Sequence, residues 1–233
     1  MPIATRSSKF DISKKKNLEK IISKILKKIK IGDTIFLYGA IGVGKTTMCE
    51  KLSEVFSLQP VYESVIDNPY LEDFYSDMER WSFNLQIYFL YHRFSSQVKL
   101  SNMNKGFIQD RTIYEDKEIF AQNLKDIGCM SIRDWETYNE LFNNMSQFIN
   151  SPDLIIYLKA NTDTLLSRIK NRKRSFEKTI SPEYIHSLNV YYNKWIDKID
   201  NHKVLIIDTN NFNIFNDFEK LDDIINSIKK KII

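Results

Sequence analysis

The sequence has few of the residues that cross-link small extracellular domains or hold metals. Only two of its 233 residues are cysteines, Cys49 and Cys129, and they lack a CxxC spacing. Its three histidines show no spacing typical of metal ligands. We therefore expect neither a disulfide scaffold nor a structural zinc site, and the expected location is a reducing compartment, the cytoplasm.

Long apolar runs are missing as well. No stretch reaches the roughly 18 consecutive apolar residues that a membrane-spanning helix needs. The net charge is only +4, which is too small to indicate a nucleic-acid partner. We thus expect neither a membrane nor a nucleic acid among the partners of this protein.

No linker rich in proline, glycine or serine divides the chain, so residues 17–233 are expected to form a single domain. Residues 1–16 carry Arg6 and a lysine run at 14–16, and are expected to form a flexible N-terminus. A mitochondrial transit peptide is the alternative interpretation, but Asp11 and the lack of an amphipathic pattern count against it.

Short apolar runs, each followed by a polar turn and a helical pattern, recur along the chain. They lie at 34–38, 107–109, 154–158 and 204–207. Such alternation predicts an α/β fold with a parallel sheet and helices on both faces. Residues 45–56 show a helical pattern directly after the first run, and residues 71–100, which contain no Pro or Gly, predict one long helix.

Three of the six glycines lie within the segment GAIGVGKT at 39–46, between a predicted strand and a predicted helix. This is a phosphate-binding P-loop, whose main-chain N–H groups cradle phosphates. Lys45 is expected to bridge the β- and γ-phosphates of ATP, and the Thr46 hydroxyl to help hold Mg²⁺. The predicted ATP-binding residues here are Gly39, Ala40, Ile41, Gly42, Val43, Gly44, Lys45, Thr46 and Thr47.

A P-loop alone leaves GTPases, ATPases, nucleotide kinases and nucleoside kinases open. No NKxD motif for reading guanine is present, which disfavours a GTPase.

Glu63 follows a second predicted strand at 61–62, where a carboxylate can meet an acceptor hydroxyl. Asp110 follows the strand at 107–109 and is predicted to lie near Mg²⁺. The basic segment at 168–178 is predicted to close over an anionic ligand.

Four segments together resemble the deoxyribonucleoside kinase family, which contains deoxycytidine, deoxyguanosine, deoxyadenosine and insect multisubstrate kinases. They read GAIGVGKTT at 39–47, ESVIDNPYLEDFYSDMERWSFNLQIYFLYHR at 63–93, DRTIYEDKEIF at 110–120 and RIKNRKRSFE at 168–177. The resemblance implies a P-loop kinase fold with a five-stranded parallel sheet and a basic lid. It also implies ATP-dependent phosphorylation of a deoxyribonucleoside 5′-hydroxyl, as part of nucleotide salvage, and a homodimer.

For catalysis, the resemblance implies that Glu63 accepts the proton of the 5′-hydroxyl and that Arg111 holds both this glutamate and the phosphate. With Lys45, these are the predicted catalytic residues. The arginines of the basic lid resemble those that close over the transferred phosphate, namely Arg168, Arg172 and Arg174.

For the nucleoside, the resemblance implies that Tyr75 and Glu177 bind the sugar 3′-hydroxyl and that Gln86 pairs with the edge of the base. Arg93 and Asp116 are similar to the charged pair that completes base reading. An aromatic residue that stacks on the base completes the predicted substrate-binding set, which is Glu63, Tyr75, Gln86, Arg93, Arg111, Asp116, Phe120 and Glu177.

The chain departs from the family pattern at Ser64, where proline is usual, and at Leu85 and Phe89 beside the base-pairing glutamine. Asp116 can accept from an exocyclic amine and Gln86 can pair bidentately with adenine or cytosine. We therefore expect deoxyadenosine or deoxycytidine to be preferred over thymidine, with deoxyguanosine possible.

Two alternatives compete with this interpretation. A nucleoside monophosphate kinase of the thymidylate kinase type shares the P-loop and lid, but it would need a basic residue for the acceptor phosphate, and residues 64–67 offer none. A non-catalytic ATP-binding module would leave Lys45, Glu63 and the basic segment unexplained.

Overall fold

The structure is a computed structural model that describes residues 33–62, 68–103, 105–172, 180–200 and 202–232. The predicted flexible N-terminus at 1–16 lies outside these residues, so it stays a prediction, as does the single domain at 17–233.

Five parallel strands form one sheet in the order β2-β3-β1-β4-β5. Every residue of β1 is buried, which explains why this strand reads as a short apolar run. Strand β3 is also fully buried, although its second half is Gln109 and Asp110. The strand bounds are β1 Thr34–Tyr38, β2 Gln59–Val61, β3 Phe107–Asp110, β4 Leu154–Lys159 and β5 Val204–Asp208. The prediction of an α/β fold with a parallel sheet is confirmed.

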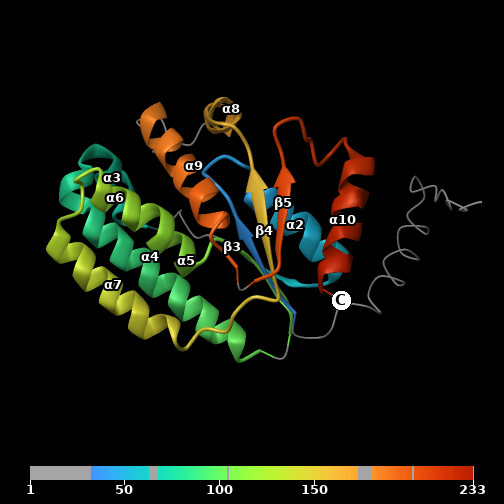
Figure 1. The fold of residues 1–233 in the computed structure, drawn as a ribbon, viewed down its shortest axis with the longest axis horizontal. Helices are drawn as coiled ribbons and strands as arrows, with labels where there is room; N and C mark the ends of the chain where they lie inside the picture. Colours follow the sequence, from blue (N-terminus) through green and yellow to red (C-terminus); the bar gives the residue numbers. More distant parts are fainter. Residues whose placement is uncertain (1–32, 63–67, 104, 173–179, 201, 233) are drawn as a thin grey trace, which may run out of the picture.

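Helices cover both faces of this sheet (Figure 1). On one side lie α2 (Lys45–Phe56) and α10 (Phe218–Ile232). On the other lie the long helix α4 (Met78–Ser101), α7 (Ile132–Ser146) and α9 (Pro182–Ile196). The remaining helices are α3 Leu71–Ser76, α5 Ile113–Glu115, α6 Gln122–Asp126 and α8 Thr162–Arg172.

The single long helix predicted at 71–100 is wrong, because the chain breaks at Asp77. Helix α3 ends at Ser76, and Asp77 has an extended backbone with φ −149° and ψ 88°. The Asp77 side chain accepts a hydrogen bond from the Arg80 N–H at 3.0 Å, which caps the start of α4. Aspartate is a favoured N-cap, but the pattern of apolar residues runs through this position without interruption.

A π-helix, η1, spans Asp116–Ala121 between α5 and α6. Such wider turns are rare and occur frequently at functional sites. Nothing in the sequence pattern indicated it, because apolar residues spaced for an α-helix fit a short π segment equally well. The consequence is local: Asp116 and Phe120 both line the same pocket.

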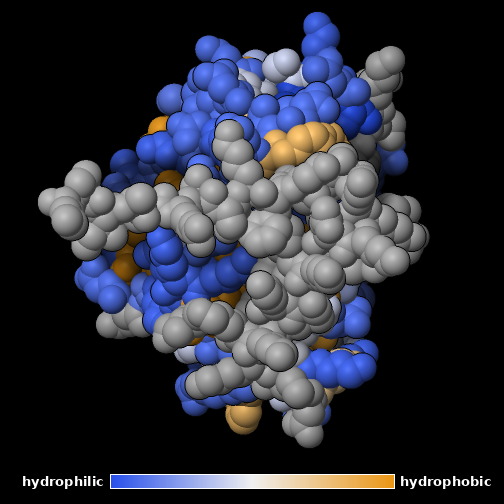
Figure 2. Space-filling view, turned by 90° about the vertical axis from the view of Figure 1, so that its right-hand side faces the viewer, coloured by the Kyte–Doolittle hydropathy of each residue, from blue (hydrophilic) through white to orange (hydrophobic). Residues whose placement is uncertain are grey.

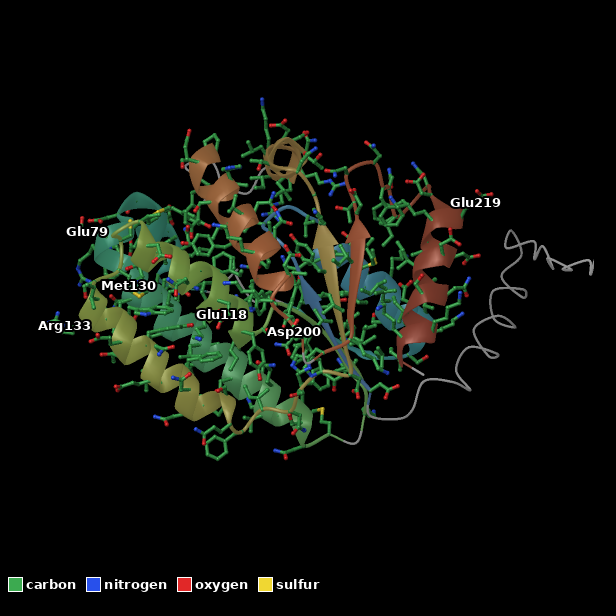
Figure 3. The ribbon with its side chains drawn as sticks, viewed as in Figure 1. Glu79, Glu118, Met130, Arg133, Asp200 and Glu219 are labelled. Atoms are coloured by element: carbon green, nitrogen blue, oxygen red, sulfur yellow. The ribbon has the colours of Figure 1, made fainter. Side chains whose placement is uncertain are left out.

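One face of the molecule shows how polar and apolar residues are distributed on the surface. On the side that carries α10, the described residues are mostly hydrophilic, with scattered apolar patches (Figure 2). Charged side chains such as Arg133 and Glu219 lie at the periphery (Figure 3). Within the described ranges, no helix combines the length and the apolar composition that crossing a membrane requires.

Candidate active site

The P-loop connects β1 to α2, as predicted, and its shape depends on glycine. Gly39 has φ 149° and Gly42 has φ 88°, in the region that side chains disfavour. A Cβ on Gly39 would lie 2.7 Å from the carbonyl oxygen of Leu158, and one on Gly42 would lie 2.9 Å from that of Leu165. Neither main-chain oxygen can give way easily, so both positions require glycine.

Lys45 is the first residue of α2 and is buried beneath the loop. Its Nζ donates to the carbonyl oxygen of Gly39 at 2.5 Å and to that of Ala40 at 3.3 Å. The start of α2 directs free main-chain N–H groups and the positive end of the helix dipole at the same place. The loop therefore offers an ammonium group and main-chain donors to an anion.

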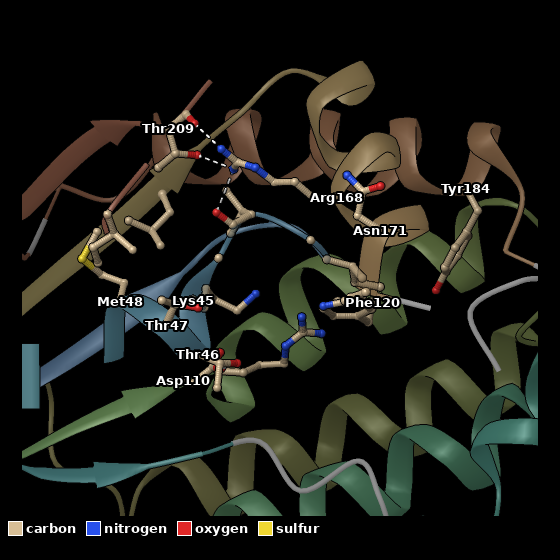
Figure 4. Close-up of a pocket in the computed structure, with 18 of the residues that line it drawn as sticks. Lys45, Thr46, Thr47, Met48, Asp110, Phe120, Arg168, Asn171, Tyr184 and Thr209 are labelled. Carbon is tan, nitrogen blue, oxygen red and sulfur yellow. Dashed lines mark hydrogen bonds between the residues drawn. The ribbon is translucent and has the colours of Figure 1, made fainter. Parts of the chain in front are cut away.

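Thr46 and Asp110 form the floor of the site (Figure 4). The Thr46 hydroxyl donates to Asp110 Oδ2 at 2.7 Å. The other carboxylate oxygen, Oδ1, is buried and has no hydrogen-bond partner within the described residues. Mg²⁺ binds through one or two protein oxygens together with phosphates and water. The Thr46 hydroxyl and Asp110 Oδ1 lie beside the phosphate loop and are ligands of the kind that Mg²⁺ uses.

Arg111 follows β3 with a left-handed backbone, φ 71°, which is costly for a residue with a long side chain. Its N–H donates to the carbonyl oxygen of Leu37 at 3.4 Å, and its own carbonyl accepts from Gln109 Nε2 at 3.0 Å. These contacts hold the turn, and the guanidinium carbon lies 4.4 Å from the centre of the Phe120 ring. The turn thereby places a buried cation in the pocket.

Arg93 and Asp116 form a buried ion pair deeper in the same pocket. The Arg93 guanidinium also lies 4.2 Å from the centre of the Phe89 ring. In the described part of the chain, Gln86 Oε1 and Asp116 Oδ2 are buried without a hydrogen-bond partner. Buried polar atoms in a native protein nearly always have partners, so these two oxygens are available to a ligand.

Tyr184 is a pocket residue that the sequence analysis missed. It comes from α9 and its side chain points into the pocket, opposite Lys45 (Figure 4). Burial, the largest cause, raises the pKa of Tyr184, so its hydroxyl remains protonated and can donate. A tyrosine within an amphipathic helix gives no sequence signal that separates it from core residues. Tyr75, which was predicted, lines the same pocket from α3.

Arg168 connects α8 to the P-loop and to the loop that follows β5 (Figure 4). Its Nη1 donates to the carbonyl oxygen of Val43 and to the hydroxyl of Thr209, both at 3.1 Å. Its Nη2 donates to the carbonyl oxygen of Thr209 at 2.5 Å.

Residues 209–215 of the loop line the pocket, although no sequence motif indicated this. Arg172, at the end of α8, also reaches the pocket.

These groups line one pocket of about 960 Å³. The predicted residues that line it are Ile41, Gly42, Val43, Gly44, Lys45, Thr46, Thr47, Tyr75, Gln86, Arg93, Asp110, Arg111, Asp116, Phe120, Arg168 and Arg172. Gly39 and Ala40 belong to the P-loop but are not part of this lining. Glu63, Arg174 and Glu177 lie outside the described residues, so their predicted roles stay predictions.

Solved structures with this architecture include deoxyadenosine kinase from M. mycoides. The form with bound dATP superposes with a TM-score of 0.73 and 30% sequence identity, and the match covers 83% of this chain and 99% of that one. The form with the products dCMP and a flexible dCDP gives a TM-score of 0.74 and 31% identity, with the same coverage. The P-loop kinase fold predicted from the sequence is confirmed.

Curated relatives agree with this match. The chain is 38% identical to the deoxyadenosine/deoxycytidine kinase of Bacillus subtilis over 200 residues, which is 85% of this chain and 92% of the relative. It is 43% identical to the deoxyadenosine kinase of Dictyostelium discoideum over 178 residues, 76% of this chain and 72% of the relative. The family model for deoxynucleoside kinase matches residues 35–233. This chain therefore belongs to the deoxynucleoside kinase family.

Proposed function

We propose that this protein transfers the γ-phosphate of ATP to the 5′-hydroxyl of a deoxyribonucleoside, with deoxyadenosine or deoxycytidine preferred. One observation carries the proposal: a single pocket runs from a phosphate loop with Lys45 to the buried Arg93–Asp116 pair and the orphaned Gln86 oxygen. A phosphate cradle at one end and base-reading groups at the other suit a nucleotide donor and a nucleoside acceptor.

The donor is assigned to the P-loop end. The phosphates lie against the loop amides and Lys45, and Arg168 and Arg172 neutralise charge on the other side. The adenine of ATP extends toward the loop at 209–215, because this loop continues the pocket beyond Arg168. Thr46 and Asp110 would hold a Mg²⁺ ion, which would supply charge neutralisation at the phosphates.

The acceptor lies toward α3, α4 and η1. Gln86 and Asp116 offer buried acceptor oxygens to an exocyclic amine, as adenine and cytosine possess. Arg93 pairs with Asp116 and holds its carboxylate in place. Tyr75 and Tyr184 face the sugar from α3 and α9. The relatives named deoxyadenosine kinase and deoxyadenosine/deoxycytidine kinase support this choice of bases.

In the reaction, the 5′-oxygen forms a bond to the γ-phosphorus, the bond from this phosphorus to the bridging β-γ oxygen breaks, and ADP leaves. The hydroxyl proton passes to the Glu63 carboxylate, as the resemblance to the family implies. A carboxylate is too weak a base to create a free alkoxide, so proton transfer accompanies or follows formation of the P–O bond. Glu63 therefore acts mainly by aiming the oxygen, while Lys45, Arg111 and Arg168 stabilise charge on the phosphoryl group.

The Glu63→Gln variant tests this role. We expect it to lower kcat by about a hundredfold or more, because the amide cannot accept the proton, while the affinity for ATP stays unchanged. Steady-state kinetics and calorimetric ATP binding measure the two effects. Glu72→Gln, the same change on an exposed position of α3, is the control and should retain full kcat. Turnover of Glu63→Gln at the wild-type rate would contradict the assignment of Glu63.

A second copy of this chain is the proposed partner, in a cytoplasmic homodimer. Helices α4 and α7 pack together, and Ile132, Leu141 and Phe148 leave apolar side chains exposed around α7. Light scattering should give twice the chain mass of 27.6 kDa, and Phe148→Glu should shift the protein toward the monomer. A monomer at micromolar concentration would contradict this part of the proposal.

A further inference from the structure

Glu115, the last residue of α5, is completely buried beneath the P-loop, and none of the roles above includes it. Its carboxyl group accepts three hydrogen bonds from three parts of the fold. Oε1 accepts from the N–H of Gly39 at 3.3 Å and from the hydroxyl of Tyr192 at 2.7 Å. Oε2 accepts from the N–H of Thr112 at 3.1 Å. One side chain therefore joins the end of β1, the turn after β3 and helix α9.

All three partners are donors, which an ionised carboxylate satisfies because it only accepts. Burial, the largest cause, raises the pKa of Glu115, whereas Lys45, Arg111 and the Tyr192 hydroxyl oppose that effect. Asp110 adds a smaller contribution that raises the pKa. The buried anion is thus supported by hydrogen bonds and by two cations of the active site.

The two main-chain groups that Glu115 holds border the reaction centre. Gly39 begins the P-loop, and its carbonyl oxygen accepts a hydrogen bond from Lys45 Nζ at 2.5 Å. Thr112 follows Arg111, whose left-handed backbone persists only while its surroundings hold it. A shift of Glu115 would consequently move both the phosphate cradle and the Arg111 turn.

We propose that Glu115 is a positioning residue for phosphoryl transfer. Through Gly39 and Thr112 it sets the spacing between the P-loop and the Arg111 turn, and so between the donor phosphates and the groups that hold the acceptor. Among the described residues, Glu115 is not part of the pocket lining, so it acts through these neighbours and not by touching substrate. This inference rests on the proposed kinase function.

Neither glutamine nor aspartate, the two side chains most similar to glutamate, is expected to replace Glu115. In Glu115→Gln, one oxygen becomes an NH₂ group, and in either amide orientation this group faces the N–H of Gly39 or of Thr112. Glu115→Asp keeps the charge but shortens the side chain by one methylene, so the carboxylate can no longer reach both amides. If removal of the buried charge prevents Glu115→Gln from folding, the test is made with Glu115→Asp.

Tyr192→Phe is the matched control. It removes the third donor to the same carboxylate, and creates a comparable defect in the core, but leaves both main-chain hydrogen bonds and the charge. We expect Glu115→Gln and Glu115→Asp to lower kcat by about tenfold or more while the nucleoside KM changes less than about twofold. Tyr192→Phe should keep kcat within about threefold of wild type although its melting temperature falls.

The kinetics are measured well below the melting temperature of each variant, so that all molecules are folded. A folded Gln or Asp variant with wild-type kcat would overturn the proposal. So would equal losses of kcat in Tyr192→Phe and the Glu115 variants, because these would indicate general damage to the core. A wild-type protein that phosphorylates no deoxyribonucleoside would overturn the proposed function, and this inference with it.

Discussion

Asp116 uses its two carboxylate oxygens differently. Oδ1 pairs with Arg93, whereas Oδ2 is buried without a hydrogen-bond partner in the described part of the chain. Removing one member of a buried pair leaves the other charge uncompensated, which costs more than the pair itself contributes. We therefore expect stability and substrate recognition to depend on the same carboxylate.

Changing Asp116 to Asn should affect both properties. We expect the free energy of unfolding to fall by roughly 3–5 kcal/mol, because the buried Arg93 guanidinium loses the negative charge of its Asp116 partner. The kcat/KM for deoxyadenosine should fall by about tenfold or more, since the amide presents a donor where the base amine needs an acceptor. Denaturant unfolding and steady-state kinetics measure the two effects. Glu219→Gln on the surface of α10 should change neither, and wild-type values for Asp116→Asn would exclude this role for Asp116.

Thr46 supplies a second residue-scale test. Thr46→Val keeps the shape of the side chain but removes the hydroxyl that bonds Asp110 at 2.7 Å. We expect kcat to fall by about a hundredfold, with a higher Mg²⁺ concentration needed for half-maximal activity, because the proposed Mg²⁺ site would lose one of its protein oxygens. Thr46→Ser retains the hydroxyl and should stay close to wild type. Equal Mg²⁺ dependence in both variants would count against a metal role.

Residues inside a motif could be placed from the sequence, and isolated ones could not. Lys45, Thr46 and Asp110 were predicted because the P-loop spacing and the strand ends fix their positions. Tyr184 and Glu115 were missed. A tyrosine in a helix looks like an ordinary core residue, and the spacing of Glu115 from Thr112 is that of a helix capping box, which does not indicate the contact of Glu115 with Gly39. Their importance depends on what the fold packs against them.

At the scale of elements, one side chain of α8 joins the P-loop to the loop after β5 by hydrogen bonds. Arg168 donates to the carbonyl oxygen of Val43 and to both oxygens of Thr209. A lysine side chain carries one ammonium group in place of the planar guanidinium with its several N–H donors. It therefore cannot bond Val43 and Thr209 at the same time.

Arg168→Lys should therefore raise the KM for ATP by about tenfold while the nucleoside KM stays unchanged. Initial rates at varied ATP concentration measure this effect. Lys170→Gln, an exposed change on the same helix, should leave the ATP KM as it is. If both variants behave alike, the Arg168 bridge has no part in donor binding.

The break between α3 and α4 depends on the Asp77 cap. Asp77→Ala should lower the free energy of unfolding by about 0.5–2 kcal/mol, because the Arg80 N–H loses its acceptor. Asp77→Asn keeps an acceptor oxygen and should lose much less. Urea denaturation distinguishes the two, and an Ala variant as stable as wild type would show that the cap contributes nothing.

The strand-helix alternation was predictable because strands buried on both faces read as short apolar runs. The helix break at Asp77 and the π-helix at Asp116–Ala121 were not, because each depends on a local backbone geometry that the periodicity of apolar residues does not record.

For the whole molecule, the strand order brings the site together. Strands β1 and β3 are neighbours, with Leu37 opposite Asp110, so the segments that follow them meet at one edge of the sheet. Parallel sheets bind ligands at this carboxyl edge, which made the general location predictable. The order itself was not predictable from the chain, because it depends on pairing between segments distant in sequence.

Ligand binding should stabilise the whole fold. ATP with Mg²⁺ at about 100 times its Kd should add roughly 2.7 kcal/mol to the free energy of unfolding. Thermal unfolding with and without the ligand measures this gain. Lys45→Ala should show a much smaller gain, because this change removes the ammonium group that we propose binds the phosphates. An undiminished gain in this variant would mean that ATP binds elsewhere.

The most direct test of the central claim is a substrate panel. The purified protein, labelled ATP and Mg²⁺ are combined with each of the four deoxyribonucleosides and, separately, with their 5′-monophosphates, and kcat/KM is measured for each. The account predicts 5′-monophosphate products, with deoxyadenosine or deoxycytidine giving the highest kcat/KM. The highest value for thymidine, or phosphorylation of the monophosphates alone, would contradict it.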